Sequence, residues 1–204
     1  MTGPRARPAT SADWPEIAAL RHRVSVLEQG VPPDVERDAA DALAVHALSR
    51  DAAGRVVATG RLLERGGLAG IGRMAADPAV RGAGHGAAVL AELEWLAVLR
   101  GLPAVELHAQ VSARGSYDRA GYAAVGAEYV EAGLAHVTMR RSLPALHVGP
   151  GRWELTDAAG AVLAAVAVHD GAPGIEHVTE GAEELAGRLL VLAGADLRSS
   201  AGAV

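Results

Sequence analysis

The segment 69–100 constrains the fold more than any other, because three different kinds of pattern follow one another within it. "AGIGRMAAD" is typical of a strand, and Pro78 ends it. "RGAGHG" is a glycine-rich turn, and an apolar segment runs from it to about Arg100. That segment repeats apolar residues at helical spacing on one face, namely Val89, Leu93 and Leu96, widened by Leu90 and Ala97. The segment therefore predicts a strand, a glycine-rich loop and a helix in direct succession.

The same patterns predict the other elements of the chain. A helix is expected to start near Asp13 and to stop at Gly30, before two prolines. Strands are expected at 42–49, 55–63 and 103–110, a short helix at 113–121, and a pair of strands at 123–131 and 134–143. After Pro144 the sequence pattern changes, and it predicts a hairpin over 151–170 and a helix over 179–194.

Length and composition indicate one domain with a small addition. Of the 204 residues, 50% are hydrophobic but only 3% are aromatic, and phenylalanine is absent. The core is therefore expected to consist of alanine, valine and leucine. We predict a main domain over 1–144 and a C-terminal extension over 145–204.

Several classes of chemistry are excluded by missing residues. The chain has no cysteine, and all 19 basic residues are arginine. Disulfides, cysteine-ligated zinc, a Walker A lysine and a Schiff base are therefore impossible. We find no metal-binding motif. The net charge of −5 argues against a nucleic-acid partner.

The sequence gives no sign of export or of a membrane partner. The N-terminus lacks the apolar region of a signal peptide. The longest apolar run, near "AVLAAVAV", is far shorter than the ~20 residues of a membrane helix. We therefore expect a cytoplasmic protein.

The glycine-rich loop has three interpretations. Gly82, Gly84 and Ala87 fit the dinucleotide pattern G-x-G-x-x-A, but "DPAVR" separates the strand from the first glycine, which argues against it. The loop also fits a tight turn without a ligand. In the third interpretation it holds the pyrophosphate of an acyl-CoA, since successive amides and a helix N-terminus attract anions.

The third interpretation is supported by a resemblance to the GNAT acetyltransferase superfamily. The family's loop motif, Q/R-x-x-G-x-G/A, is matched by Arg81, Gly84 and Gly86. A second motif, N-x-x-A-x-x-x-Y-x-x-x-G-F, is matched with two replacements, Gln for Asn and Tyr for Phe; its residues here are Gln110, Ala113, Tyr117, Gly121 and Tyr122.

A narrower resemblance is to the ElaA-like branch of that superfamily. Its early motif is matched by Arg21, Val24, Glu28, Gln29, Gly30, Val31, Pro32, Glu36 and Asp38. Its closing motif is matched by Gly126, Glu128, Tyr129, Glu131, Gly133, His136 and Met139. The resemblance covers about residues 5–142 and does not extend to the C-terminal extension.

The resemblance implies an α/β fold, with a mixed, twisted sheet and helices on both faces, followed here by a small ββα addition. It implies acetyl-CoA as co-substrate, with the pantetheine arm pairing along a strand like an extra strand. The implied acetyl-CoA-binding residues are Met74, Ala75, Ala76, Arg81, Gly82, Ala83, Gly84, His85, Gly86, Ala87 and Gln110. Within this set His85 is interpreted as a loop side chain, because the loop binds through its amides.

Acetyl transfer to an amine also needs an acid and a neutral nucleophile. The resemblance implies Tyr117 as the general acid that protonates the leaving thiolate. Glu28 is our first choice of general base; an ordering role for Glu28 and a water relay remain open.

Glu36, Asp38 and Asp41 are interpreted as a solvated loop face, and His46 as a structural histidine. His108 and Glu106 are expected to share one face of a strand, and the sequence assigns a role to neither of them.

The acceptor is expected to be a small-molecule amine, because no large charged docking surface is evident. A domain that binds acyl-CoA as a sensor or scaffold, with little turnover, is the alternative. The extension could close the cleft, cover a sheet edge or pair two chains, and the last possibility favours a homodimer.

Overall fold

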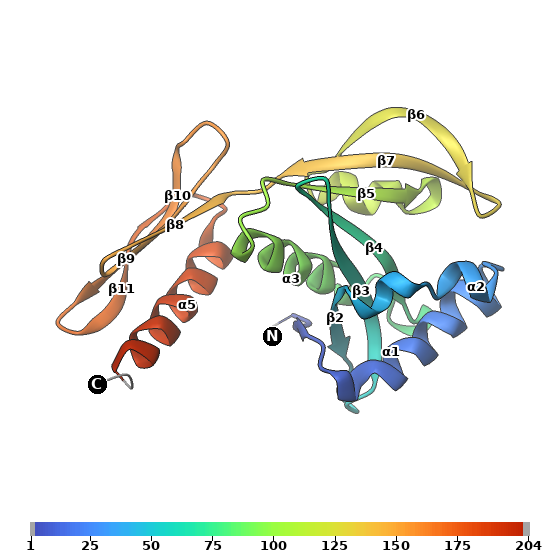
Figure 1. Cartoon of the computed structure of the whole chain (residues 1–204), viewed down its shortest axis with the longest axis horizontal. Coiled ribbons are helices and arrows are strands. Elements are labelled where there is room, and N and C mark those ends of the chain that lie inside the picture. The colour runs from blue at the N-terminus through green and yellow to red at the C-terminus, as the bar shows by residue number, and fades with distance from the viewer. Residues whose placement is uncertain (1–2, 202–204) are drawn as a thin grey trace. The chain divides into compact units, whose positions relative to one another are not determined.

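The computed structural model describes residues 3–201. The chain divides into two compact units, Met1–Arg141 and Ser142–Val204 (Figure 1). Each has its own sheet and its own buried core. No helix within residues 3–201 is long and apolar enough to cross a membrane.

In the described part of the first unit, seven strands form a single sheet in the order β1-β2-β3-β4-β5-β7-β6. Pairs β1–β2, β2–β3, β3–β4 and β6–β7 are antiparallel, whereas β4 and β5 run parallel. The predicted mixed sheet is therefore confirmed. The strands are β1 (Ala6–Pro8), β2 (Val45–Arg50), β3 (Val56–Arg65), β4 (Leu68–Ala76), β5 (Ala104–Gln110), β6 (Ala123–Glu131) and β7 (Leu134–Ser142).

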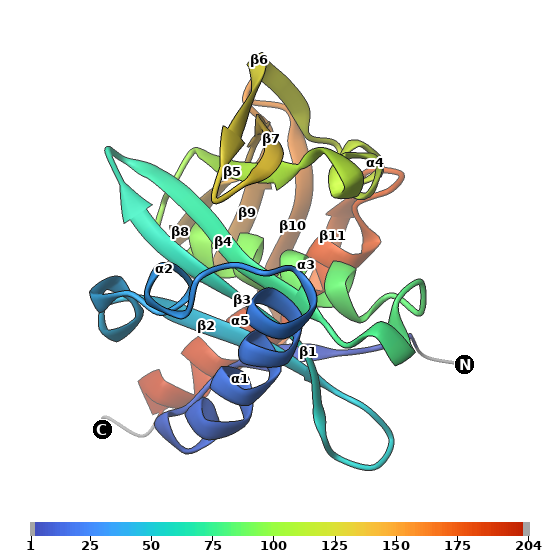
Figure 2. The ribbon, with the colours of Figure 1, turned by 90° about the vertical axis from the view of Figure 1, so that its right-hand side faces the viewer.

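The helices of this unit cover both faces of the sheet, as expected (Figure 2). They are α1 (Trp14–Arg21), which continues as a π-helix (His22–Glu28), α2 (Pro33–Glu36), α3 (His85–Leu99) and α4 (Arg114–Arg119). Two neighbouring residues of β3 show the two faces. A Cβ on Gly60 would meet Leu93 of α3, whereas Arg61 reaches the opposite face, where its partner Asp41 also binds Arg21 of α1.

A bulge in β4 separates that strand from β5. Thr59 and Arg61 of β3 lie opposite Ala75 and Gly72, so two residues of β4 face one residue of β3. Arg73, in the bulge, has a φ of 52°, which L-residues rarely adopt. Among the described residues, pairing between β4 and β5 stops at Ile71 and Leu107. Beyond this point the two strands diverge.

The second unit is a four-stranded antiparallel sheet with a helix on one face. The strands β8 (Ala145–Gly149), β9 (Arg152–Thr156), β10 (Val162–His169) and β11 (Ala172–Val178) lie in the order β11-β10-β9-β8. Helix α5 (Glu183–Ala201) packs on β9, β10 and β11. Trp153 is buried, and its indole N–H donates to Asp196 over 2.8 Å. The hairpin and helix agree with the prediction; β8 and β11 were not predicted.

Gly60 allows the bulge to pack, and replacing it tests that role. An ideal Cβ there would lie less than 3.0 Å from both Met74 Sδ and Leu93 Cδ1. Gly60→Ala is therefore expected to lower the free energy of unfolding by about 1–3 kcal/mol. Gly72→Ala is the matched control in β4, because its Cβ would meet nothing within 4 Å. Urea unfolding measures both. Equal stability of the two variants would contradict this account of the packing.

Candidate active site

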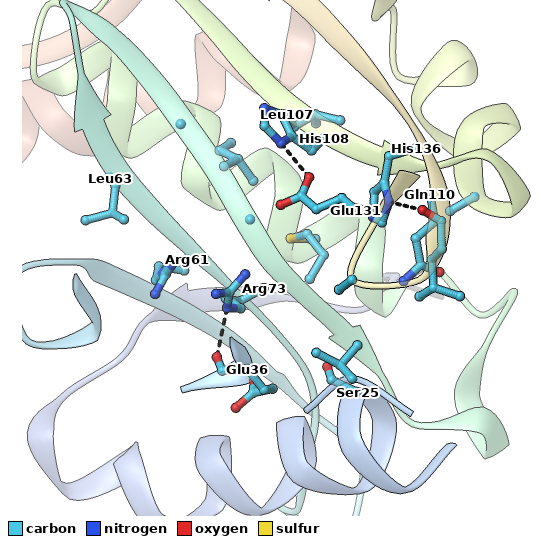
Figure 3. A pocket seen from close by; sticks show the side chains of 18 of the residues that line it. Ser25, Glu36, Arg61, Leu63, Arg73, Leu107, His108, Gln110, Glu131 and His136 are labelled. Atoms are coloured by element: carbon cyan, nitrogen blue, oxygen red, sulfur yellow. Dashed lines mark hydrogen bonds and ion pairs between the residues drawn. The ribbon is translucent and has the colours of Figure 1, made fainter. Parts of the chain in front are cut away.

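A cavity of about 390 Å³ opens where β4 and β5 diverge (Figure 3). Its walls come from the end of the π-helix, α2, β3, β4, β5, α4 and the β6–β7 hairpin. Three of the sequence-predicted site residues line it, namely Met74, Gln110 and Tyr117. The bulge and the divergence thus turn a continuous sheet into one with a concave site at its centre.

Tyr117 of α4 presents a phenol to this cavity. The side chain is half-buried, and burial raises its pKa to about 12. Its ring packs edge-on against Tyr122, with the ring centroids 5.9 Å apart. Within residues 3–201, the Tyr117 hydroxyl has no hydrogen-bond partner, whereas the Tyr122 hydroxyl donates to Glu94 over 2.7 Å. The Tyr117 hydroxyl is therefore protonated at neutral pH and available to a ligand.

The glycine-rich loop ends at the N-terminus of α3. Gly82 and Gly84 have φ values of 80° and 92°, so both positions favour glycine. Ala88 N donates to Gly84 O, which leaves the amides of His85, Gly86 and Ala87 as the first turn of the helix. Such amides have no partner within their own helix, and the helix dipole adds partial positive charge. The local structure therefore has the features of an anion site.

The space above Gly86 is open. A Cβ on Gly86 would meet no described atom within 4 Å, and its φ does not lie in the left-handed region. Neither packing nor backbone conformation within the described chain thus requires glycine there. His85, in contrast, is turned into the structure: its Nδ1 lies 2.9 Å from Ser49 Oγ of β2, which donates to Arg5 O. This position agrees with the interpretation of His85 as a loop side chain.

Arg81 and Glu28 form an ion pair beside the loop. Both distances between the guanidinium nitrogens and the carboxylate oxygens are 2.7 Å, and Arg81 Nε also donates to Ala76 O. The hydrogen bonds from Arg81 lower the pKa of the Glu28 carboxyl. Glu28 is not among the residues that line the cavity. The structure therefore brings the two predicted residues together, outside the cavity.

The remaining residues that are predicted to bind acetyl-CoA include Ala75 and Ala76 of β4, Gln110 at the end of β5 and Ala83 of the loop. Ala75 and Ala76 pair with β3 on one side. Gln110 donates to Gln29 Oε1 over 3.0 Å and so joins the end of β5 to the end of the π-helix. Ala83 follows Gly82 in the turn, and its amide donates to Val80 O.

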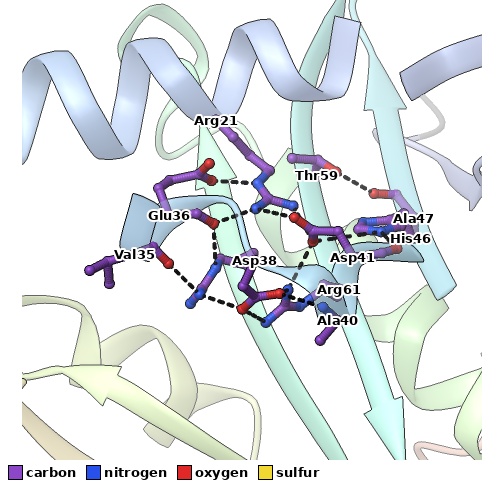
Figure 4. A network of polar contacts seen from close by, with 11 residues as sticks. Arg21, Val35, Glu36, Asp38, Ala40, Asp41, His46, Ala47, Thr59 and Arg61 are labelled. Carbon is purple, nitrogen blue, oxygen red and sulfur yellow. Dashed lines mark hydrogen bonds and ion pairs between the residues drawn. The ribbon is translucent and has the colours of Figure 1, made fainter. Parts of the chain in front are cut away.

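A network of ion pairs holds the wall opposite β5 (Figure 4). Arg21 is 1% exposed and donates to Glu36 and Asp41. Arg61 donates to Asp38 and Asp41. The interpretation of Glu36 and Asp41 as a solvated face is therefore wrong: both are buried because arginines from α1 and β3 compensate their charges. The pattern did not show which arginines would lie there.

The same network contains the bulge and a structural histidine. Arg73 donates to the carbonyls of Val35 and Glu36 and to Asp38. These bonds hold the bulge against the 33–38 segment. His46 is buried, with Nε2 3.2 Å from Asp41 O, but among the described residues its Nδ1 has no hydrogen-bond partner, so the histidine is only partly satisfied.

Sequence reasoning missed one pair of residues in the cavity. His108 Nδ1 of β5 lies 2.9 Å from Glu131 Oε2, at the end of β6 (Figure 3). Both side chains line the cavity. Glu131 belongs to the closing ElaA-like motif, so the motif marked its position. The register that brings it to His108 was not visible in the sequence.

Comparisons with known proteins place this geometry in a class. Residues 23–143 match the family model of the acetyltransferase (GNAT) domain. The uncharacterized protein YyaT of Bacillus subtilis (strain 168) is 31% identical over 140 residues, which is 67% of this chain and 94% of that protein. An acyl-CoA N-acyltransferase from Pseudomonas aeruginosa is 29% identical, with a TM-score of 0.60 over 68% of this chain and 99% of its own. Escherichia coli ElaA is 23% identical, with a TM-score of 0.59 over 68% and 99% of the two chains, and so shares the fold.

The fold and these comparisons define an acyl-CoA-dependent acyltransferase that transfers an acyl group to an amine. The chain belongs to the GNAT acetyltransferase family. The narrower assignment to the ElaA-like branch stays a prediction based on the two motifs.

Gly86 provides a test of the anion site. Gly86→Leu places a side chain in the space above the first helical turn, where its Cβ would meet no described atom within 4 Å. We expect at least a tenfold loss of acetyl-CoA affinity, about 1.4 kcal/mol, by isothermal titration. The thermal midpoint should stay close to that of the wild type. Unchanged affinity in a folded variant would contradict the placement of the ligand at this turn.

Asp38 provides a test of the wall network through pH. Hydrogen bonds from Arg61 lower the pKa of Asp38 to about 2. The stabilisation is thus complete above the unfolded-state pKa of about 4 and disappears as the pH falls toward 2. Asp38→Asn is expected to lose about 1 kcal/mol at pH 7, after allowance for the 33% exposure of the side chain.

Urea unfolding between pH 7 and pH 2.5 measures the effect of Asp38→Asn. The difference from the wild type should shrink below about pH 4. Asp34→Asn, an exposed neighbour in α2, is the control and should change stability by less than about 0.5 kcal/mol. A difference for Asp38→Asn that does not vary with pH would contradict the role given to the charge.

Proposed function

We propose that this protein transfers the acetyl group of acetyl-CoA to a small-molecule amine by direct attack, with Tyr117 as the general acid. One observation carries the proposal above the others. A half-buried phenol without a partner in residues 3–201 lines a cavity at the divergence of β4 and β5. A hydroxyl that lines a cavity and makes no hydrogen bond with the described chain is free to bind a ligand.

The proposed position of acetyl-CoA follows from the unpaired groups. Beyond Ile71 the edge of β4 that faces β5 is not paired with it, so Met74, Ala75 and Ala76 offer backbone groups to the pantetheine arm. The amides at the start of α3 then receive the pyrophosphate. The acyl end would reach the cavity beside Met74 and Tyr117.

The raised pKa of Tyr117 suits the role of an acid. A phenol with a pKa of about 12 keeps its proton throughout the neutral range. Its hydroxyl can then donate to the sulfur as negative charge develops there, and burial strengthens that interaction. Arg81 would add a charge to the pyrophosphate site if its guanidinium left Glu28.

Glu28, our first choice of general base from the sequence, has surroundings that favour an ordering role instead. Both carboxylate oxygens accept from Arg81, and the pKa of Glu28 is lowered. A weaker base on an occupied carboxylate is a poor proton acceptor. The ordering interpretation makes Glu28 a residue that positions Arg81.

The size of the cavity supports a small acceptor. A volume of about 390 Å³ lies in the range of sites for small molecules. Its lining mixes arginine, carboxylate and imidazole side chains, which are suited to a polar amine.

Tyr117→Phe tests the acid directly. Removal of the hydroxyl is expected to lower kcat about 10²-fold or more, with little change in the KM for acetyl-CoA. Thiol release with benzylamine, glycinamide and spermidine measures turnover. Tyr122→Phe is the matched control, because its hydroxyl is bound to Glu94 and should leave kcat within a few-fold. Full turnover by Tyr117→Phe would show that Tyr117 is not the general acid. A wild-type protein that binds acetyl-CoA but acetylates none of these amines would favour the sensor alternative.

A further inference from the structure

His108 sits where the two central strands separate. Leu107 is the last residue of β5 that pairs with β4 in the described register, and His108 follows it directly. Glu106, His108 and Gln110 alternate along β5, so they share one face, and all three line the cavity. His108 therefore lies in the cavity that we assign to the acyl end of acetyl-CoA.

The partner of His108 determines which ring nitrogen carries the proton. An ionised carboxylate only accepts hydrogen bonds, so with neutral imidazole the Nδ1 atom, 2.9 Å from Glu131 Oε2, must be the donor. The Nε2 atom then carries a lone pair. Among the described residues it has no hydrogen-bond partner. The ring is further held edge-on by Tyr129, with centroids 5.7 Å apart.

Other groups near the pair do not compete for Glu131. Glu106, on the same face of β5, is bound by Arg140 Nε over 2.6 Å. His136, the other imidazole of the cavity, directs Nδ1 to the carbonyl of Leu134 over 2.9 Å. His136 is 9% exposed and lacks a carboxylate, whereas the His108 side chain is 48% exposed. Only one of the two imidazoles in the cavity, among the described residues, thus has both a carboxylate and a route to solvent.

We propose that His108 is the general base that accepts a proton from the acceptor amine, and that Glu131 is the residue that positions it. This inference rests on the proposed function. An imidazole that is oriented by a carboxylate at one nitrogen and free at the other is a recurrent arrangement for proton transfer. The carboxylate also stabilises the imidazolium that forms.

An acceptor RNH₃⁺ carries three N–H protons, and the amide product keeps one. His108 Nε2 takes one proton and passes it to solvent, and the neutral amine then forms the C–N bond. The C–S bond breaks, and Tyr117 gives a proton to sulfur. The second amine proton replaces the one that Tyr117 gave. The products are the amide, CoASH and one released proton.

The test compares His108→Ala with His136→Ala and Glu28→Gln, using acetyl-CoA with benzylamine, glycinamide and spermidine. We expect His108→Ala to lose about 10²-fold or more in kcat and to keep the wild-type Kd for acetyl-CoA. Added imidazole should restore part of the lost rate in His108→Ala. A smaller loss is expected for Glu131→Gln, with recovery in Glu131→Asp.

Nitrogen-15 spectra of the histidine rings supply a readout that does not depend on turnover. The proton of His108 should lie on Nδ1 in the wild type, and this preference should weaken in Glu131→Gln. A proton on Nε2 in the wild type would overturn the assignment of the base.

The remaining outcomes each decide against the proposal. Full kcat in His108→Ala overturns it. An equal loss of kcat in His136→Ala, with rescue by imidazole only in that variant, would identify His136 as the base. A loss of kcat only in Glu28→Gln would identify Glu28 as the base. If the wild type itself acetylates none of the three amines and does not bind acetyl-CoA, the proposed function fails first.

Discussion

The bulge at Arg73 is the constraint on which the site depends. A left-handed backbone at a residue other than glycine costs about 1–2 kcal/mol, and the surrounding structure must hold it. Three hydrogen bonds from the Arg73 guanidinium, two to backbone carbonyls and one to Asp38, provide that hold. The bulge turns β4 away from β5, and the cavity and the free strand edge follow from that divergence.

The charge network extends this constraint to the rest of the first unit. Arg21 from α1, Arg61 from β3 and Arg73 from β4 converge on three carboxylates of the 33–42 segment. Burial of so many charges is tolerable only because each has a partner of opposite sign. The network therefore fixes one wall of the cavity. Strand β5, helix α4 and the β6–β7 hairpin contribute the side that holds Tyr117 and the His108–Glu131 pair.

Patterns of local origin could be predicted from the sequence. The glycines at 82 and 84 indicated a tight turn, and the structure shows positive φ at both. The apolar spacing of Val89 and Leu93 indicated a helix face, and both are buried. The motif around Tyr117 predicted a tyrosine at the site, and that side chain lines the cavity.

Contacts that depend on sheet register could not be predicted in this way. The pairing of Glu28 with Arg81 joins residues 53 positions apart. The pairing of His108 with Glu131 depends on the β6–β7 hairpin, and the left-handed Arg73 has no signature in "IGRMAAD".

We propose that acyl-CoA lies along the free edge of β4, with its pyrophosphate at the start of α3. Amide hydrogen exchange, measured by NMR with and without acetyl-CoA, tests this placement most directly. With acetyl-CoA bound, exchange should be slower for unpaired amides in the segment from Met74 to Ala76 and for those of His85, Gly86 and Ala87, because ligand oxygens become their acceptors. Saturable binding of acetyl-CoA that leaves exchange at both segments unchanged would rule out this placement of the ligand.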